Sequence, residues 1–203
     1  MWVFLFLPGS LNHFCTGCYS CIKDETKCPY YDEKRVIADA MEQAELLIFT
    51  TPVYCLECSA PLKAFIDLFY QYWIPHRPRG DMFRKKAVVI STAAGNGTGK
   101  AVAPVMRTLA YWGDPYRKSY GKAVSAMTWK QVPDKKKQRI NKDMTALANK
   151  NRRAKVGKPS LYIRFLFRLM ASVKRSAPED SYDAEEVRYW QKNGWLDGKK
   201  PWM

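Results

Sequence analysis

Four of the chain's six cysteines lie within fourteen residues, in the stretch CTGCYSCIKDETKC. Thiolates at this spacing suit a [4Fe–4S] cluster, which takes four cysteine ligands. A zinc site is one alternative, although zinc usually binds paired C-x-x-C arms that a longer loop separates. A loop that holds no metal is the other alternative. The candidate metal ligands are Cys15, Cys18, Cys21 and Cys28.

Two further stretches, TTPVY (residues 50–54) and STAAGNG (residues 91–97), each follow an apolar run that suits a buried strand. The first presents the aromatic ring of Tyr54, and the second brings a backbone with little side-chain bulk. Together they could form a slot with exposed amide N–H groups and one aromatic wall, which suits a flat polar heterocycle. Two ordinary βα loops are the alternative, because glycine is common in such loops.

The elements that must position these loops alternate between strand and helix. Apolar runs that end at proline, glycine or polar residues predict strands at residues 2–7, 46–50, 87–92 and 120–127. Capping residues and apolar periodicity predict helices that begin near Asp32, that open at Ser59-Pro61, that end at Gly113, and that cover about residues 133–154 and 160–175. This alternation predicts an α/β fold with a mainly parallel sheet, in which ligands bind at the carboxyl ends of the strands.

The net charge of +15 is concentrated in the C-terminal third. Residues 1–129 carry 15 basic and 11 acidic side chains, whereas residues 130–203 carry 19 basic and 8 acidic ones. Such a surface could serve nucleic acid, an anionic membrane face or an acidic partner, but a solvated helical surface is the favoured interpretation. The stretch SLYIRFLFRLMASVKR could lie on a membrane as a basic amphipathic helix, and packing on the core or on a partner subunit is favoured. We therefore divide the chain into a core, residues 1–129, and a basic helical segment, residues 130–203.

The sequence indicates a cytoplasmic protein with reduced cysteines. The opening MWVFLFLPGS is apolar, but it lacks the basic segment and the small-residue cleavage site of a signal peptide. No apolar run approaches the roughly 20 residues that span a bilayer, so we expect no transmembrane segment. Thiols stay reduced in the cytoplasm, which disfavours a disulfide-bonded cysteine loop.

The sequence TPVYCLECSAPLKAFIDLFYQYW, followed by KKAVVISTAAGNG, resembles the flavodoxin-like NAD(P)H-dependent FMN reductases, and more narrowly their iron–sulfur flavoprotein branch. In that family a strand that ends in S/T-P-V-Y leads to a helix that begins S-A-x-L-K-x-F-I-D, and a cysteine loop precedes both. His76 to Pro78, Trp112-Gly113 and Tyr189 to Asp197 also look like family features. The resemblance covers most of residues 11–197. It implies a flavodoxin-like three-layer sandwich with a C-terminal helical extension.

The resemblance also implies that FMN is held at the strand ends. Hydride would pass from NAD(P)H to the flavin and onward to a small-molecule or protein electron acceptor. A [4Fe–4S] cluster on the cysteine loop would exchange single electrons with that flavin. The family's tendency to oligomerise implies a homo-oligomer, and no nucleic-acid partner is expected. The residues that would lie along the flavin are Thr51, Pro52, Val53, Tyr54, Thr92, Ala93, Ala94, Gly95 and Asn96.

Hydride transfer to a flavin needs no side-chain acid, base or nucleophile, so we nominate no catalytic residue. Cys55 and Cys58 form a second C-x-x-C at the expected start of a helix. A flavin-coupled dithiol is one interpretation, because a helix N-terminus lowers the pKa of a thiol. Two small buried residues are the favoured interpretation. We interpret His13 as structural.

The N-terminal end departs from the family pattern, which begins with a strand, a phosphate-binding loop and a helix that receives the FMN phosphate. Only fourteen residues precede Cys15, and Pro8 to Ser10 is too short to form such a loop. We therefore expect an N-terminally abbreviated sheet, in which residues 2–7 correspond to the family's second strand. Two hypotheses compete with the flavoenzyme: a non-enzymatic metal- or nucleic-acid-binding module that uses the cysteine loop and the basic segment, and an inactive truncated flavodoxin-like protein.

Overall fold

The computed structural model describes residues 2–178 and 180–203, and at its centre is a parallel sheet of three strands in the order β1-β2-β3. The strands are β1 (Leu46–Pro52), β2 (Lys86–Ala93) and β3 (Tyr116–Ala123). The register pairs Leu46 with Lys86 and Lys86 with Tyr116, so the strands start level and end level. Because the strands are parallel, all three carboxyl ends lie at one edge of the sheet.

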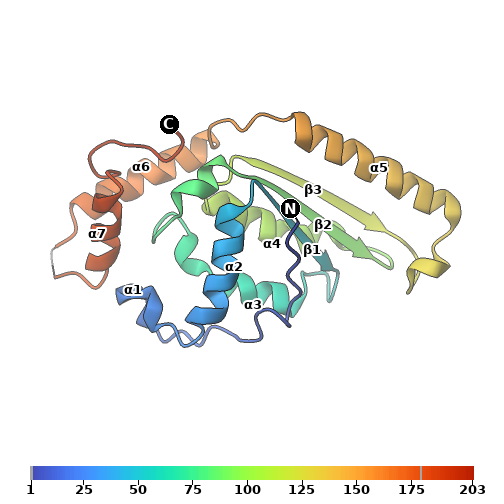
Figure 1. The fold of residues 1–203 in the computed structure, drawn as a ribbon, viewed down its shortest axis with the longest axis horizontal. Helices are drawn as coiled ribbons and strands as arrows, with labels where there is room; N and C mark the ends of the chain where they lie inside the picture. The colour runs from blue at the N-terminus through green and yellow to red at the C-terminus, as the bar shows by residue number, and fades with distance from the viewer. Residues whose placement is uncertain (1, 179) are drawn as a thin grey trace.

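Helices cover both faces of this sheet (Figure 1). On one face, α4 (Thr98–Tyr111) contacts all three strands. The helices α2 (Tyr31–Gln43) and α3 (Ala60–Leu68) contribute to the same apolar core, which includes Leu47, Val89 and Leu109. On the other face lies α5 (Asp134–Arg153), which is separated from the sheet by a groove of about 870 Å³. The predicted α/β class with a parallel sheet between helical layers is confirmed.

The C-terminal helices α6 (Leu161–Arg175) and α7 (Ala184–Lys192) form the predicted helical extension. Their aromatic residues build a second buried cluster around Phe167, whose ring lies 4.7 Å from that of Trp190 and 5.4 Å from that of Trp195. Phe83 joins this cluster from the core, with its ring 5.7 Å from that of Phe167. The extension therefore packs on the core through a buried aromatic contact.

The remaining helices are short. Within the cysteine loop lie α1 (Ser20–Lys23) and the 3-10 helix η1 (Glu25–Lys27). The other 3-10 helices are η2 (Tyr70–Tyr72), η3 (Gly80–Arg84) and η4 (Trp129–Gln131). In the described residues, no helix is long and apolar enough to cross a membrane.

Local signals explain the start and the end of two core helices. Ser59 is the N-cap residue of α3, and Pro61 lies in its first turn, as the sequence predicts. Helix α4 ends at Tyr111, and its C-cap residue is Trp112. The next residue, Gly113, has a φ of 101°, a backbone conformation that is less costly for glycine than for any other residue. A Cβ atom there would lie 2.5 Å from the ring of Phe83, so this position also needs the absence of a side chain.

The strand predicted at residues 2–7 is wrong. Residues 2–6 form neither helix nor strand, and the side chains of Trp2, Phe4 and Phe6 are 69%, 74% and 75% exposed. An apolar run becomes a strand only where a neighbouring strand accepts its backbone hydrogen bonds. In the described part of the chain, the outer edge of β1 pairs with no strand.

Two other predicted boundaries are corrected. Strand β3 covers Tyr116–Ala123, not residues 120–127. The strand begins before residue 120 because Asp114 accepts a hydrogen bond from the Tyr116 N–H at 2.9 Å. The charged residues of β3 are tolerated because β3 lies at an edge of the sheet. Asp32 lies in the first turn of α2 and does not cap it, since the N-cap residue is Tyr30.

Candidate functional site

The carboxyl edge of the sheet brings together three loops. The N–H of Val53, just after β1, donates to the carbonyl of Thr92 at 3.2 Å. After β3, the N–H groups of Val124 and Ser125 donate to the carbonyls of Ala93 and Ala94, each at 2.8 Å. These backbone bonds hold the loop after β2 between its two neighbours. The two predicted flavin-binding stretches therefore lie side by side, as the order of the strands requires.

The loop after β1 makes a tight turn at Cys55 and Leu56. Tyr54 and Glu57 exchange two backbone hydrogen bonds, of 3.0 and 2.9 Å, around this turn. Cys55 and Leu56 have φ angles of 51° and 63°, which is the type I′ pattern that normally uses Asn and Gly. Residues held in this region cost free energy, and such strain often accompanies ligand sites. The turn leaves the Tyr54 side chain 62% exposed at the edge of the sheet.

Gly97 lets the loops after β1 and β2 approach closely. A Cβ atom on Gly97 would lie 2.8 Å from side-chain carbons of both Val53 and Leu56. Gly97 also has a φ of 97° and is the N-cap residue of α4. Asn96 supports this geometry by accepting a hydrogen bond from the Gly97 N–H at 2.7 Å. Both the space and the backbone conformation therefore require glycine at this position.

The loop after β2 offers backbone donors to a ligand. The N–H groups of Ala94, Gly95 and Asn96 donate to no acceptor in the residues that the structure describes, and all three residues are exposed. Alanine and glycine side chains leave room for a flat ring to approach these donors. This shelf, with Tyr54 at its side, fits the polar edge of a flavin ring.

The predicted flavin-binding residues divide into two groups. Those that reach the surface of the shelf are Pro52, Val53, Tyr54, Thr92, Ala94, Gly95 and Asn96. Thr51 and Ala93 are buried, with exposed fractions of 3% and 7%. The Thr51 hydroxyl accepts a hydrogen bond from the Ser59 N–H at 3.0 Å, so it fixes the start of α3. Thr51 and Ala93 thus support the shelf from below.

The four cysteines of the predicted metal site line one cavity of about 240 Å³, together with Tyr19, Tyr30 and Tyr70. Cys21 is buried, and its sulfur lies 3.4 Å from the Tyr70 hydroxyl. Cys15 and Cys18 are exposed, and hydrogen bonds from Ser20 lower the pKa of the Cys18 thiol. Within the described residues, no three His, Cys, Asp or Glu side chains are arranged to hold a metal ion. The donor set therefore fits a cluster, while the sulfur positions in this conformation do not.

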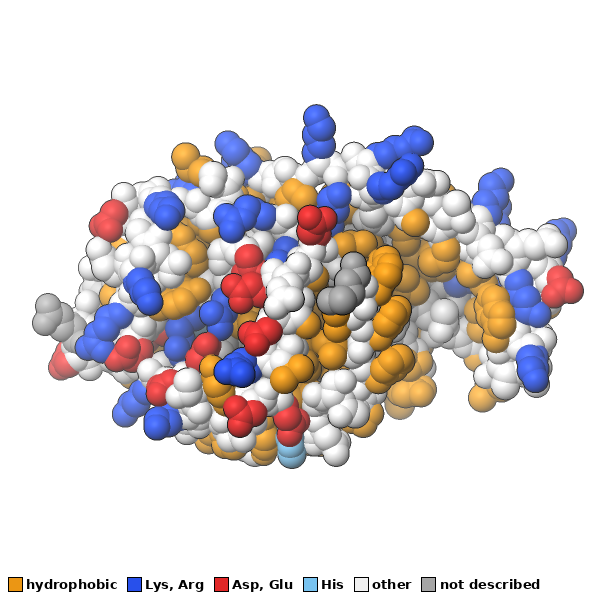
Figure 2. Space-filling view, in the orientation of Figure 1, with side chains coloured by type: hydrophobic (Ala, Val, Ile, Leu, Met, Phe, Trp, Pro, Cys, Tyr) orange, Lys and Arg blue, Asp and Glu red, His pale blue; other side chains and the backbone are white. Residues whose placement is uncertain are grey.

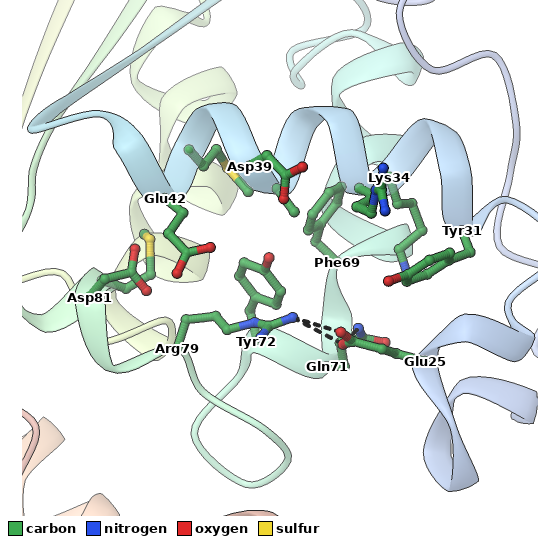
Figure 3. A pocket seen from close by; sticks show the side chains of 14 residues that line it. Glu25, Tyr31, Lys34, Asp39, Glu42, Phe69, Gln71, Tyr72, Arg79 and Asp81 are labelled. Carbon is green, nitrogen blue, oxygen red and sulfur yellow. Dashed lines mark hydrogen bonds and ion pairs between the residues drawn. The ribbon is translucent and has the colours of Figure 1, made fainter. Parts of the chain in front are cut away.

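Two arginines from the loop after α3 fix the cysteine loop in place, a contact that the sequence did not reveal. Arg77 donates to the carbonyls of Cys21 and of Ile22, the latter at 2.9 Å. Arg79 donates to both carboxylate oxygens of Glu25 at 3.0 Å, and Gln71 donates to the same carboxylate. Figure 3 shows Arg79 and Glu25 pointing toward each other across a pocket of about 180 Å³, with Tyr72 beside them.

The electrostatics of this pocket favour the charged arginine. Burial alone would lower the pKa of Arg79, but Tyr72 and Glu25 outweigh it, so the pKa is raised. Burial raises the pKa of Tyr72 to about 12, which keeps this phenol neutral at physiological pH. The Arg79 side chain lies over the Tyr72 ring, 5.1 Å from its centre. The only signal in the sequence was the family-like HRP at residues 76–78, which the structure identifies as part of this loop.

A second network joins the same loop to the C-terminal helices. The imidazole of His76 lies 3.1 Å from the carboxylate of Glu186, which also accepts from Lys174 at 2.9 Å. Trp190 and Tyr189 donate to the backbone carbonyls of His76 and Pro78, at 2.6 and 2.8 Å. The family-like residues 76–78 and 189–197 are therefore parts of one contact between core and extension.

The cysteine cavity and the strand-end shelf lie at opposite ends of α3. Asp67 and Leu68, at the end of this helix, line the cavity, whereas the turn at Cys55-Leu56 precedes its start. A helix of nine residues is about 13 Å long, which sets the scale of the separation. In the second C-x-x-C, Cys55 is exposed and Cys58 is buried. The sequence interpretation of two buried residues is therefore wrong for Cys55 and correct for Cys58. Burial raises the pKa of the Cys58 thiol.

The chain matches the family of NADPH-dependent FMN reductases over residues 7–125, which is more than half of its length. The chain belongs to this family. The resemblance that the sequence showed is thereby confirmed, and the matched range contains both strand-end loops and the cysteine loop.

A curated protein is similar over half of this chain. An iron-sulfur flavoprotein from Archaeoglobus fulgidus is 33% identical over 102 residues, which are 50% of this chain and 44% of that protein. The chain thus spans about half the length of this curated relative.

Two solved structures are also similar. A Trp repressor binding protein from Bacillus subtilis is 25% identical, with a TM-score of 0.37 over 44% of this chain and 62% of that chain. A thermophilic tryptophan halogenase from Streptomycin violaceusniger is 16% identical, with a TM-score of 0.40 over 59% of this chain and 75% of that chain.

Proposed function

We propose that the chain is a flavin oxidoreductase that binds FMN at the strand-end shelf and takes electrons from NAD(P)H. The observation that carries this proposal is the match to the FMN reductase family across residues 7–125, a range that includes the shelf. The free N–H groups of Ala94, Gly95 and Asn96 support it, because a flavin ring needs donors along its polar edge. The electron acceptor would be a small molecule or a protein.

The protein's own part in this chemistry is to bind and orient the ring. FMN, when bound, would accept electrons from NAD(P)H and pass them on. Ala94, Gly95 and Asn96 would donate backbone hydrogen bonds to the ring, and Tyr54 would cover one side of it. Gly97 would hold the two loops at the correct spacing. No side chain on the shelf needs to move a proton, so this proposal names no catalytic residue.

We further propose that the cysteine loop binds a [4Fe–4S] cluster through Cys15, Cys18, Cys21 and Cys28. All four line one cavity, and all six cysteines of the chain are free thiols. Cluster binding would require the exposed Cys15 and Cys18 to move toward the buried Cys21. Gly17 permits such movement, because its φ of 68° suits glycine and nothing crowds a Cβ atom there. Reduced thiols are consistent with the proposed cytoplasmic location. A homo-oligomer is proposed from the family alone.

The first experiment is a flavin titration of the purified chain, followed by the quenching of flavin fluorescence. We expect FMN to bind, and Tyr54→Ala to weaken binding by about tenfold through the loss of ring contact. Tyr182→Ala is the matched control, because Tyr182 is 82% exposed and lies far along the chain from the shelf. A chain that binds neither FMN nor riboflavin contradicts the flavoenzyme.

The second experiment tests the cluster separately. The chain is purified without oxygen, and its iron and acid-labile sulfide are measured. We expect Cys21→Ser to abolish the iron content and Cys55→Ser, outside the cavity, to leave it unchanged. Zinc in place of iron, or no metal in the unsubstituted chain, rejects the cluster while leaving the flavin proposal intact.

A further inference from the structure

One side of α6 is an apolar ridge that the fold leaves exposed. Four apolar residues recur at every fourth position, so they align along the helix. The exposed fractions of Leu161, Phe165, Leu169 and Val173 are 75%, 62%, 43% and 53%. Tyr162, beside the ridge, is 57% exposed. A row of this length and regularity differs from the scattered single apolar residues that are common on protein surfaces.

The ridge is not needed to attach α6 to the protein. Ile163, Phe167 and Ala171 form the opposite side of the helix, and they are at most 2% exposed. They pack in the aromatic cluster with Trp190 and Trp195. The helix therefore has one apolar face for the core and a second apolar face without a partner in the described residues.

The segment around the ridge is basic and lacks acidic residues. Residues 144–178 contain nine Lys and Arg and no Asp or Glu. The exposed members before the helix are Lys150, Arg152, Arg153, Lys155 and Lys158, and those on the helix are Arg168 and Arg175. Burial and the nearby Arg168 and Arg175 lower the pKa of Lys200. Figure 2 shows Lys and Arg gathered along the upper edge of the molecule, where α5 and α6 lie in Figure 1.

We propose that α6 lies flat on a membrane surface that contains anionic lipids. The apolar ridge would enter the boundary between headgroups and acyl chains, and the basic residues would contact lipid phosphates. An apolar face next to a lysine- and arginine-rich face is the pattern of helices that lie in the membrane interface. Clustered basic residues add electrostatic attraction to anionic lipids. This contact is peripheral and adds a membrane location to the flavin chemistry proposed above, without depending on it.

The charge distribution favours a lipid surface over the other occupants. A second copy of the chain would use the same patch in a symmetric contact, which would bring two acid-free basic segments together. Like charges placed opposite each other oppose such an association. Nucleic acid would satisfy the charges, but its phosphates would leave Phe165 and Leu169 exposed. An anionic bilayer satisfies both the ridge and the cations.

The test is flotation of the full-length chain with lipid vesicles. We expect binding to vesicles of phosphatidylcholine with phosphatidylglycerol, little binding to phosphatidylcholine alone, and weaker binding at high salt. The double substitution of Phe165→Glu and Leu169→Glu should lower the partition coefficient by about tenfold or more. The matched control is Met127→Glu with Tyr182→Glu, since these residues are 85% and 82% exposed and carry the same charge change outside the ridge. Circular dichroism and thermal unfolding verify that both variants fold.

Four results would overturn the proposal. The first is equal binding to the two kinds of vesicle, or binding to neither. The second is a ridge variant that floats as well as the control variant. The third is a dimer of the unsubstituted chain that the ridge variant breaks while vesicle binding is unchanged, which would assign the ridge to a contact between copies. The fourth is binding to duplex DNA, in the absence of vesicle binding, that the ridge variant retains.

Discussion

The Arg79 guanidinium donates to both carboxylate oxygens of Glu25 at 3.0 Å, and this pair joins the loop after α3 to the cysteine loop. Arg77, two residues earlier, donates to backbone carbonyls of α1 in the same contact. The position of the cysteines is therefore set by residues about fifty positions away in the sequence. We define this contact, made by Arg77, Arg79, Glu25 and Gln71, as the cysteine-loop latch.

Weakening the latch should expose Cys21. In Arg79→Lys the ammonium can still contact the Glu25 carboxylate, but the planar guanidinium that lies over the Tyr72 ring is lost. We expect the contact to lose about 1 kcal/mol of its stabilising free energy, since the side chains of Arg79 and Glu25 are 34% and 29% exposed and water screens the pair. The rate at which a thiol reagent modifies Cys21 should rise about fivefold.

Arg139→Lys is the matched control for this prediction. Arg139 also pairs with a carboxylate, that of Asp143 at 3.1 Å, but its side chain is 68% exposed and lies on α5. This control should leave the reactivity of Cys21 unchanged. Equal modification rates in the Arg79 variant and the unsubstituted chain would show that the latch does not hold the loop.

Gly97→Ala should disturb the proposed flavin site and the fold together. The new methyl group would meet Val53 and Leu56 at 2.8 Å, and the φ of 97° is strained for any other residue. We expect a loss of about 2 kcal/mol in the free energy of unfolding and weaker FMN binding. Gly99→Ala is the control, because nothing lies within 4 Å of its Cβ position and it is inside α4. It should be neutral or slightly stabilising, and both variants are measured by urea unfolding and flavin titration.

Much of the core could be predicted from sequence because it is encoded locally. The runs that form β1 and β2 are apolar and end at proline or small residues. Ser59 and Pro61 indicate the start of α3. The shelf followed from these strands, since parallel neighbours place consecutive loops at one edge.

The remaining features depend on partners that no local pattern reveals. Residues 2–6 have the composition of a strand and remain unpaired with the described sheet. The latch joins Arg79 to Glu25 across 54 positions, and Glu186 meets His76 across 110. In the cysteine loop, spacing identified the four thiols around one cavity. The exposure of Cys15 and Cys18 and the burial of Cys21 depend on the tertiary contacts of the loop, which the spacing does not encode.

Asp114 should make the protein less stable as the pH rises. It is fully buried, and burial raises its pKa from 3.8 to about 8. The folded state therefore keeps a proton that the unfolded state loses above about pH 4, so the free energy of unfolding falls between pH 4 and pH 8. Asp114→Asn preserves the acceptor for the Tyr116 N–H and removes the titration. We expect the variant to be more stable than the unsubstituted chain at pH 9 by about 2 kcal/mol.

The measurement is urea unfolding from pH 5 to pH 9. The pH slope should flatten in Asp114→Asn and persist in Asp134→Asn, whose side chain is 89% exposed. An unchanged slope in Asp114→Asn would mean that another group carries the pH dependence.

Glu186→Gln should loosen the contact between the core and the C-terminal extension. Glu186 accepts from Lys174, whose side chain is 3% exposed, and removing the charge leaves that ammonium with only Asp183 at 3.4 Å. Burial would raise the pKa of Glu186, but hydrogen bonds from His76 and Lys174 outweigh it, so the pKa is lowered from 4.5. The carboxylate therefore contributes stability above about pH 4.5, and this contribution disappears as the pH falls through the lowered pKa. We expect Glu186→Gln to cost about 2 kcal/mol at pH 7 and much less in acid. Glu185→Gln is the control, since it makes the same change at the neighbouring residue, whose partner Arg188 is 69% exposed. If Glu185→Gln lowered the free energy of unfolding as much as Glu186→Gln, the effect would belong to helix α7 in general.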